Sequence, residues 1–183
     1  MNALYAYHVV TDRPMQPGQR IVFDEANRSG VYRRVLEKLP IVEEIYAQPE
    51  NYTAAALEHH TRVALRELAL EEIRQKKYPH LPSRLGCLYV SETLEEAEVW
   101  AQSFISWGRP TYAIVKLKIT GSVFAGDAHN CFDATVCREE NLRMAEDYWQ
   151  NRPNRKGMPP VKEILAAGEI EVAAIVKEIN KNL

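Results

Sequence analysis

Histidine and cysteine side chains are the first candidates for chemistry in this sequence, because they are common ligands of transition metals. His129, Cys131 and Cys137 lie near one another along the chain, but their spacing matches no familiar zinc pattern. His59 and His60 are adjacent in a predicted helix, where neighbouring positions face different directions. The pair therefore cannot form one site by itself, and we predict no metal centre.

The common nucleotide-binding and hydrolase motifs are absent. No Gly-x-Gly-x-x-Gly stands between a strand and a helix, and no Gly-Lys-Ser/Thr phosphate loop occurs. The serines lack the Gly-x-Ser-x-Gly turn of a nucleophilic serine. These patterns therefore give no support for a dinucleotide-binding sheet of the doubly wound type, a phosphate-loop enzyme or a serine hydrolase.

Three segments, distant from one another in the chain, each place a polar or aromatic side chain in a defined local setting. His8 lies near the end of a first strand, and Tyr89 lies in a strand followed by a Ser/Thr turn and an Ala/Trp helix. Glu163 opens a strand that is followed by a glycine turn and a final strand. The segments are 4–10, 86–101 and 161–172.

In this order the three segments resemble the ADP-ribosyltransferase superfamily, specifically its His-Tyr-Glu branch, which includes diphtheria-toxin-like enzymes and the poly-ADP-ribose polymerases. The chain is also similar to a small bacterial family of unassigned function within that superfamily. The shared patterns read Tyr-His, Leu-Tyr-Val-Ser, Ala-Glu-Val-Trp-Ala, and Glu-Ile-Leu followed by Gly and Glu-Val. Together they span residues 5–176.

The resemblance implies an NAD pocket with a role for each residue, and NAD would be a substrate in it. His8 would hydrogen-bond a ribose hydroxyl, and the ring of Tyr89 would stack on the nicotinamide. Glu163 would accept hydrogen bonds from hydroxyls of the nicotinamide ribose and stabilise the oxocarbenium-like centre formed as nicotinamide leaves. Ser91 and Thr93 occupy the place where relatives use a hydroxyl to support the glutamate.

Other positions around this pocket follow from the same resemblance. Relatives have glycine after the first-strand histidine, where the backbone pairs with the nicotinamide amide, and here Val9 stands there. Arg20 is our choice for a pyrophosphate contact, and Arg84 is a second choice. Val161 replaces the acidic or glutamine residue that arginine- and asparagine-modifying relatives carry two positions before the glutamate, which argues against those acceptors.

The resemblance implies a mono-ADP-ribosyltransferase, an enzyme of the glycosyltransferase class. It would transfer ADP-ribose from NAD to a protein, a nucleic acid or a small molecule. A non-catalytic binding module on the same fold is the alternative. Glu169 or Glu171 would replace Glu163 as the acid if the strand register is shifted. RNA 2′-phosphate removal on a related fold would need a paired basic set that the sequence does not clearly present.

Hydrophobic periodicity and turn residues predict the elements that position these side chains. Thr93 and Glu96 fit a capping box at the start of a helix that ends near Gly108, and Pro40 should stop a helix over 30–39. A further short extended piece follows Gly18. The predicted helices are 30–39, 53–77, 93–108 and 139–149, the strands are 4–10, 86–90, 111–119, 161–166 and 169–176, and 121–137 is irregular. This order predicts an α+β fold: an ADP-ribosyltransferase-like mixed, mostly antiparallel split β-sheet with flanking helices.

Length and composition suit a single soluble domain over 1–183. The 183 residues are 46% hydrophobic and 26% charged, which is ordinary for a globular protein. A formal net charge of −2 at pH 7 gives no general attraction for nucleic acid or anionic membranes. The three cysteines suggest reduced thiols, and we see neither a signal peptide nor an apolar run long enough to span a membrane. We therefore expect a cytoplasmic protein with no membrane partner.

Overall fold

A computed structural model of the chain describes residues 3–24 and 26–179. The described residues form two compact units, each built from separate stretches of the chain. The described residues of the first unit are 3–23, 88–124 and 164–179, and those of the second are 24, 26–87 and 125–163. No helix within the described ranges is long and apolar enough to cross a membrane.

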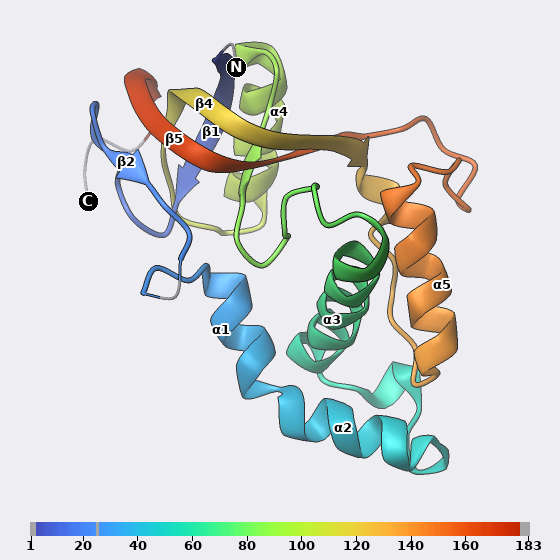
Figure 1. Ribbon diagram of the computed structural model, residues 1–183. Helices are drawn as coiled ribbons and strands as arrows, with labels where there is room; N and C mark the ends of the chain where they lie inside the picture. Colours follow the sequence, from blue (N-terminus) through green and yellow to red (C-terminus); the bar gives the residue numbers. More distant parts are fainter. Residues whose placement is uncertain (1–2, 25, 180–183) are drawn as a thin grey trace. The chain divides into compact units, whose positions relative to one another are not determined.

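The first unit contains a five-stranded sheet in which β1, β4, β5 and β2 lie in that order and β3 also pairs with β5. Figure 1 shows β1, β4 and β5 running side by side. Every pairing whose register is defined is antiparallel. The strands are β1 (Leu4–Thr11), β2 (Arg20–Ile21), β3 (Leu88–Val90), β4 (Thr111–Asp127) and β5 (Lys162–Glu178). The ends of β4 and β5, at 125–127 and 162–163, belong to the second unit.

Alternation along β1 divides its side chains between two apolar clusters. Ala6 and Val10 belong to a core built from β1, β3, β4 and β5. Val9 points to the other face, where it packs with Ala97 and Ala101 of α4 (Leu94–Ser106). The predicted capping box at the start of α4 is confirmed, because the Thr93 hydroxyl accepts from the Glu96 amide and the Glu96 carboxylate accepts from the Thr93 amide.

A close backbone contact joins β4 and β5 where Gly121 meets Gly168. A β-carbon on Gly121 would lie 2.1 Å from the Ala167 carbonyl oxygen, so only glycine fits. Gly168 has a φ of +113°, which L side chains rarely adopt. The prediction of two strands separated at Gly168 was wrong, because β5 runs unbroken through it. The glycine lets the strand continue through a strained conformation.

Gly168→Ala should lower the free energy of unfolding by about 2 kcal/mol or more. The new β-carbon would meet two backbone atoms, the Thr120 carbonyl oxygen at 2.7 Å and the Gly121 α-carbon at 2.8 Å. Urea denaturation measures the loss. Gly30→Ala is the control, because Gly30 has open space around it and no positive φ. Equal stability of the two variants would contradict the role given to Gly168.

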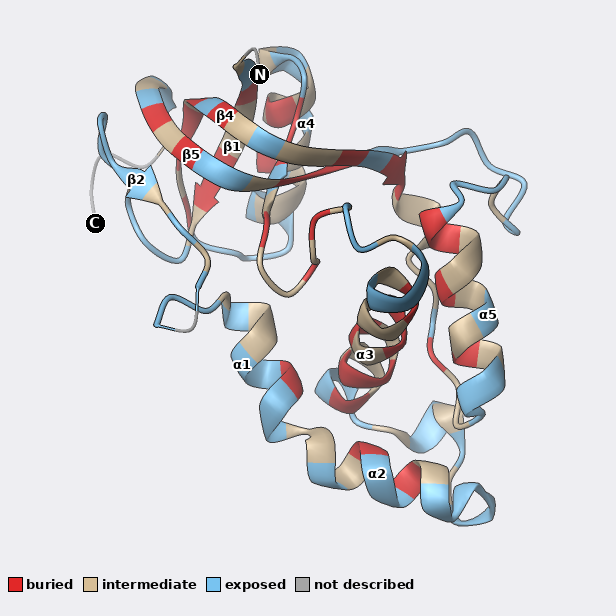
Figure 2. Cartoon of the chain, viewed as in Figure 1, coloured by how far each residue is buried: buried red, intermediate tan, exposed pale blue. Residues whose placement is uncertain are grey.

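The second unit is mainly helical. It contains α1 (Gly30–Glu37), α2 (Leu39–Ala47), α3 (His59–Lys77) and α5 (Arg138–Trp149). Two short 3₁₀ helices, Pro49–Asn51 and Ala54–Ala56, lie between α2 and α3, and a third, Ala128–Asn130, lies between β4 and α5. Helix α3 packs extensively against α5, and Figure 2 shows buried positions along α3 and α5. An apolar core joins α3 to α1 and α2.

Three boundaries in this part of the chain differ from those predicted. The helix predicted over 53–77 begins at His59, because the Glu58 carboxylate caps it by accepting from two backbone amides. Pro40 does not end helical structure, since it occupies the first turn of α2, where its missing N–H is not needed. Part of the region 121–137 that was predicted to be irregular continues β4 to Asp127.

The structure confirms the α+β class. Among the described residues there are five strands in one sheet and five α-helices. The antiparallel pairings agree with the predicted, mostly antiparallel sheet.

Candidate functional site

The first unit brings together two of the three residues that the sequence singled out. His8 in β1 and Tyr89 in β3 are 81 positions apart in the chain, yet His8 Nδ1 lies 2.7 Å from the Tyr89 carbonyl oxygen. A carbonyl can only accept, so Nδ1 carries the proton and donates. In the neutral imidazole Nε2 is then the acceptor nitrogen, and it is bonded to no described residue. A lone pair is therefore available on this side chain for a donor such as a hydroxyl.

The surroundings of His8 keep its ring neutral. Burial is the main cause and lowers the pKa of the imidazole below its ordinary value of 6.5, and the nearby Arg109 charge lowers it further. The hydrogen bond to the Tyr89 carbonyl raises the pKa of His8, but by less than burial lowers it. At neutral pH the ring is thus a hydrogen-bonding group without charge.

The lowered pKa of His8 predicts a loss of stability on acidification. Between the folded-state pKa and 6.5, the unfolded chain binds more protons on this histidine than the folded chain does. The free energy of unfolding therefore rises with pH in this window and falls as the pH is lowered through it. His8→Gln should flatten the dependence in urea denaturation at pH 7 and pH 5.5. His80→Gln, at an exposed histidine, should keep the wild-type dependence, and an unchanged slope in His8→Gln would contradict the prediction.

Tyr89 presents its ring on the outer side of β3. Its neighbours Leu88 and Val90 pack into the sheet core, so alternation turns Tyr89 the other way, and it is 36% exposed. Backbone hydrogen bonds in both directions between Tyr7 and Ser91, each 2.8 Å long, hold the end of β3 against β1. The buried Ser91 thus helps to fix the strand that carries Tyr89.

Two other predicted contacts have structural roles in this unit. The Thr93 hydroxyl caps α4 by accepting from the Glu96 amide at 3.1 Å. Val9, which stands where relatives have glycine, packs its side chain against α4. Because neighbouring residues of a strand point to opposite faces, the Val9 side chain points away from the face of β1 that carries His8.

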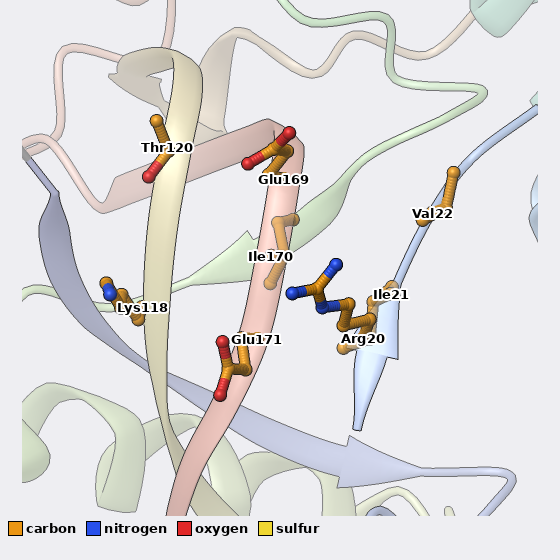
Figure 3. A pocket seen from close by; sticks show the side chains of 8 residues that line it. All are labelled: Arg20, Ile21, Val22, Lys118, Thr120, Glu169, Ile170 and Glu171. Atoms are coloured by element: carbon orange, nitrogen blue, oxygen red, sulfur yellow. The ribbon is translucent and has the colours of Figure 1, made fainter. Parts of the chain in front are cut away.

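Arg20 lines a separate cavity of about 290 Å³ in the first unit, shown in Figure 3. Arg20 is opposite Glu171 in the sheet, whereas Tyr89 is opposite Leu165. Neither His8 nor Tyr89 is among the residues that line this cavity. The structure therefore does not bring Arg20 next to the His8–Tyr89 pair. The cavity is lined by Arg20, Ile21, Val22, Lys118, Thr120, Glu169, Ile170 and Glu171.

Glu163, the third residue of the predicted set, belongs to the second unit and is 13% exposed. Its Oε1 atom accepts two hydrogen bonds, from Arg84 Nη1 at 2.5 Å and from the Tyr148 hydroxyl at 2.7 Å. Both contacts lie within the second unit. Glu163 is therefore part of a buried polar cluster, and it is not a solvent-facing strand residue.

The guanidinium of Arg84 is the centre of this cluster and is only 5% exposed. Besides Glu163 and Tyr148, it donates to Glu67, from Nε at 2.9 Å and from Nη2 at 3.3 Å. Glu67 is 2% exposed, and Nη2 also lies 3.5 Å from Cys131 Sγ. These contacts occupy the guanidinium with groups of the protein, so Arg84 is not the phosphate contact that we had considered.

Glu67 and Tyr148 were missed by the sequence reasoning. A signal for Glu67 did exist, because it stands among the apolar residues of α3 that form its buried face, with Leu65 and Leu70 fully buried on either side. A carboxylate in such a stripe requires a buried partner. Its partner could not be deduced, because Arg84 lies outside the helix. Tyr148 carried no comparable signal.

The three cysteines are free thiols. Burial raises the pKa of Cys87 to about 12 and also raises the pKa of Cys131, so both thiols are protonated and poorly reactive at neutral pH. Cys137 is exposed. Within 3–24 and 26–179, no group of three or more His, Cys, Asp and Glu side chains could hold a metal ion.

These features define an α+β protein with an antiparallel sheet, a linked histidine and tyrosine on that sheet, and a buried carboxylate–guanidinium cluster in its helical unit. The family described as "Protein of unknown function (DUF2441)" matches residues 6–180. The match covers nearly all of the chain, and the protein belongs to this family. No curated protein matches the chain at a significant level.

Proposed function

We propose that this protein is an NAD-dependent mono-ADP-ribosyltransferase with an ADP-ribosyltransferase-like fold. The glycosidic bond between nicotinamide and the C1′ atom of its ribose would break, and nicotinamide would leave with the bonding electron pair. A lone pair of the acceptor would form the new bond to C1′ and the acceptor would lose a proton. The acceptor would be a protein, a nucleic acid or a small molecule.

The hydrogen bond between His8 and Tyr89 is the observation that carries this proposal. The resemblance selected both residues, and the bond of 2.7 Å joins them across 81 positions. It holds the imidazole in the tautomer whose Nε2 accepts from a hydroxyl, and the lowered pKa keeps that nitrogen unprotonated. Such an acceptor is what hydrogen bonding to a ribose hydroxyl requires.

Tyr89 and Val9 are the other residues of the sheet that the resemblance assigns to the ligand. The Tyr89 ring is partly exposed on its strand, and a flat, cationic nicotinamide would gain by stacking on it. The Val9 side chain packs against α4, so its bulk points away from the face of β1 that carries His8. The replacement of glycine therefore does not argue against NAD.

Glu163 would be the catalytic carboxylate. Positive charge develops on the nicotinamide ribose as the glycosidic bond breaks, and a fixed negative charge beside it would stabilise that transition state. The carboxylate is held by two hydrogen-bond donors on a single oxygen. The three free thiols fit a reducing compartment, such as the cytoplasm.

Calorimetric titration of the purified protein with NAD tests the pocket. We expect saturable binding by the wild type, and an affinity for NAD that is weaker by about tenfold or more in His8→Ala and in Tyr89→Ala. A factor of ten corresponds to about 1.4 kcal/mol, which is the size expected for the loss of one hydrogen bond or one aromatic contact. Tyr5→Ala is the matched control, because Tyr5 is also an exposed tyrosine of the sheet. No binding at millimolar NAD, or equal losses in all three variants, would contradict an NAD pocket here.

A non-catalytic binding module on the same fold is the second candidate. It is favoured by the buried pairing of Glu163 with Arg84, which gives this carboxylate a structural role whether or not NAD is cleaved. Binding of NAD without release of nicotinamide over extended incubation would select this candidate over the enzyme.

A further inference from the structure

We infer that Arg84 and Tyr148 are positioning residues that hold Glu163 by one carboxylate oxygen and leave the other for a ribose hydroxyl. This inference rests on the proposed function, since it assigns the way in which the proposed catalytic carboxylate is oriented. All the residues involved lie in the second unit.

Both strong contacts of Glu163 converge on its Oε1 atom. Arg84 Nη1 and the Tyr148 hydroxyl donate to it at 2.5 and 2.7 Å, and Arg84 Nη1 also donates to the Tyr148 hydroxyl at 2.7 Å. The three groups therefore form a closed triangle of hydrogen bonds. Two donors on one oxygen restrict rotation of the carboxylate far more than a single donor would.

The other oxygen, Oε2, remains available. It accepts no hydrogen bond from a described residue. Among the described side chains, only Arg62 Nε is a polar atom that is buried without a partner, so solvent reaches Oε2. A carboxylate oxygen can accept two hydrogen bonds. The Oε2 atom is thus a preoriented acceptor for donors such as the hydroxyls of the nicotinamide ribose.

Further contacts hold Arg84 and Tyr148 in place. Glu67 engages Arg84 through both of its oxygens, at 2.9 and 3.3 Å, and Arg66 donates to Glu67 at 3.1 Å. This set contains two guanidinium groups and two carboxylates and is neutral as a whole. The Tyr148 ring also packs edge-on against Trp149, with centroids 4.9 Å apart. Arg84 and Tyr148 therefore have little freedom to move away from Glu163.

The rate of nicotinamide release from NAD by the full chain tests the inference. Tyr148→Phe keeps the ring and its packing but removes one donor from Oε1. We expect kcat to fall roughly 10- to 100-fold, because a misplaced reacting group slows the chemical step by this much. The KM for NAD should stay within about twofold of wild type, because the contacts that bind NAD in the ground state are not removed. In a Glu163→Gln background the same change should have no further effect on the residual rate, because the two residues act as one unit. A merely structural role would not produce this non-additivity.

Tyr46→Phe is the matched control, because Tyr46 also lies in the second unit and its hydroxyl accepts from Asn141 at 2.9 Å, without contact to Glu163. It should leave kcat unchanged. Arg84→Lys is a second variant, expected to show the same loss of kcat, because an ammonium cannot reproduce the two-sided guanidinium geometry. Wild-type cleavage of NAD with an unchanged rate in Tyr148→Phe would overturn this inference alone. Absence of NAD cleavage by the wild type would overturn both the inference and the proposed function.

Discussion

Glu163→Gln is expected to reduce the rate of nicotinamide release from NAD by roughly 100- to 1,000-fold, the size seen when one electrostatic contact to a transition state is removed. Glutamine keeps the shape of the side chain but carries no charge. The contribution of the charge is largest when the ribose becomes oxocarbenium-like, so the affinity for NAD should change little. Steady-state kinetics and calorimetry on the same preparation measure the two effects separately.

Glu169→Gln and Glu171→Gln are the controls for this experiment. Both carboxylates lie further along β5 and line the 290 Å³ cavity, and both were alternatives for the acid if the strand register had differed. They should retain wild-type rates. Full activity in Glu163→Gln, or a large loss in Glu169→Gln or Glu171→Gln, would show that Glu163 is not the catalytic carboxylate.

Arg84→Met should lower the free energy of unfolding by about 3–5 kcal/mol, because it removes the guanidinium that pairs with two buried carboxylates, Glu67 and Glu163. Glu67 is 2% exposed, so water cannot replace the guanidinium beside this carboxylate without opening the structure. The pKa of Glu67 is held below its ordinary value by Arg84 and Arg66, against the effect of its burial. Urea denaturation at pH 7 measures the loss.

Two comparisons separate this effect from the general cost of removing an arginine. Arg143→Met removes a guanidinium that is 63% exposed and lies 3.9 Å from Glu140, and should cost about 0–1 kcal/mol. The double variant Glu67→Gln with Arg84→Met should recover part of the stability, because it removes a carboxylate that is 2% exposed and would keep only Arg66 as its counter-charge. A small loss in Arg84→Met, similar to that of Arg143→Met, would contradict the description of the cluster as buried and coupled.

The sequence by itself determined the elements whose signals are local. The strand β1 and the helix α5 were predicted within one or two residues of their observed bounds, and the capping box of Thr93 and Glu96 was predicted correctly. Such features depend on hydrogen bonds and side-chain periodicity within a few positions of the chain. The α+β class followed from the order of these elements.

Two errors in the predicted elements had different physical causes, one a contact distant in the sequence and the other a local helix cap. A glycine between two apolar runs indicated a turn, but Gly168 meets Gly121 of the neighbouring strand, and β5 continues through it. The predicted helix over 53–77 began too early because residue propensity favours helix there, while the Glu58 carboxylate fixes the actual start. Helix propensity is only a weak prior that other contacts override.

Only the tertiary structure decided how the functional side chains are paired. His8 meets Tyr89 across 81 positions, and Arg84 reaches Glu67, Tyr148 and Glu163 across 17, 64 and 79 positions. Sequence reasoning had considered Arg84 as a phosphate ligand and had left Glu67 unnoticed. The physical reason is that a charged group becomes buried only when partners from other segments compensate its lost hydration. Neither its burial nor its partners are encoded in the residues next to it.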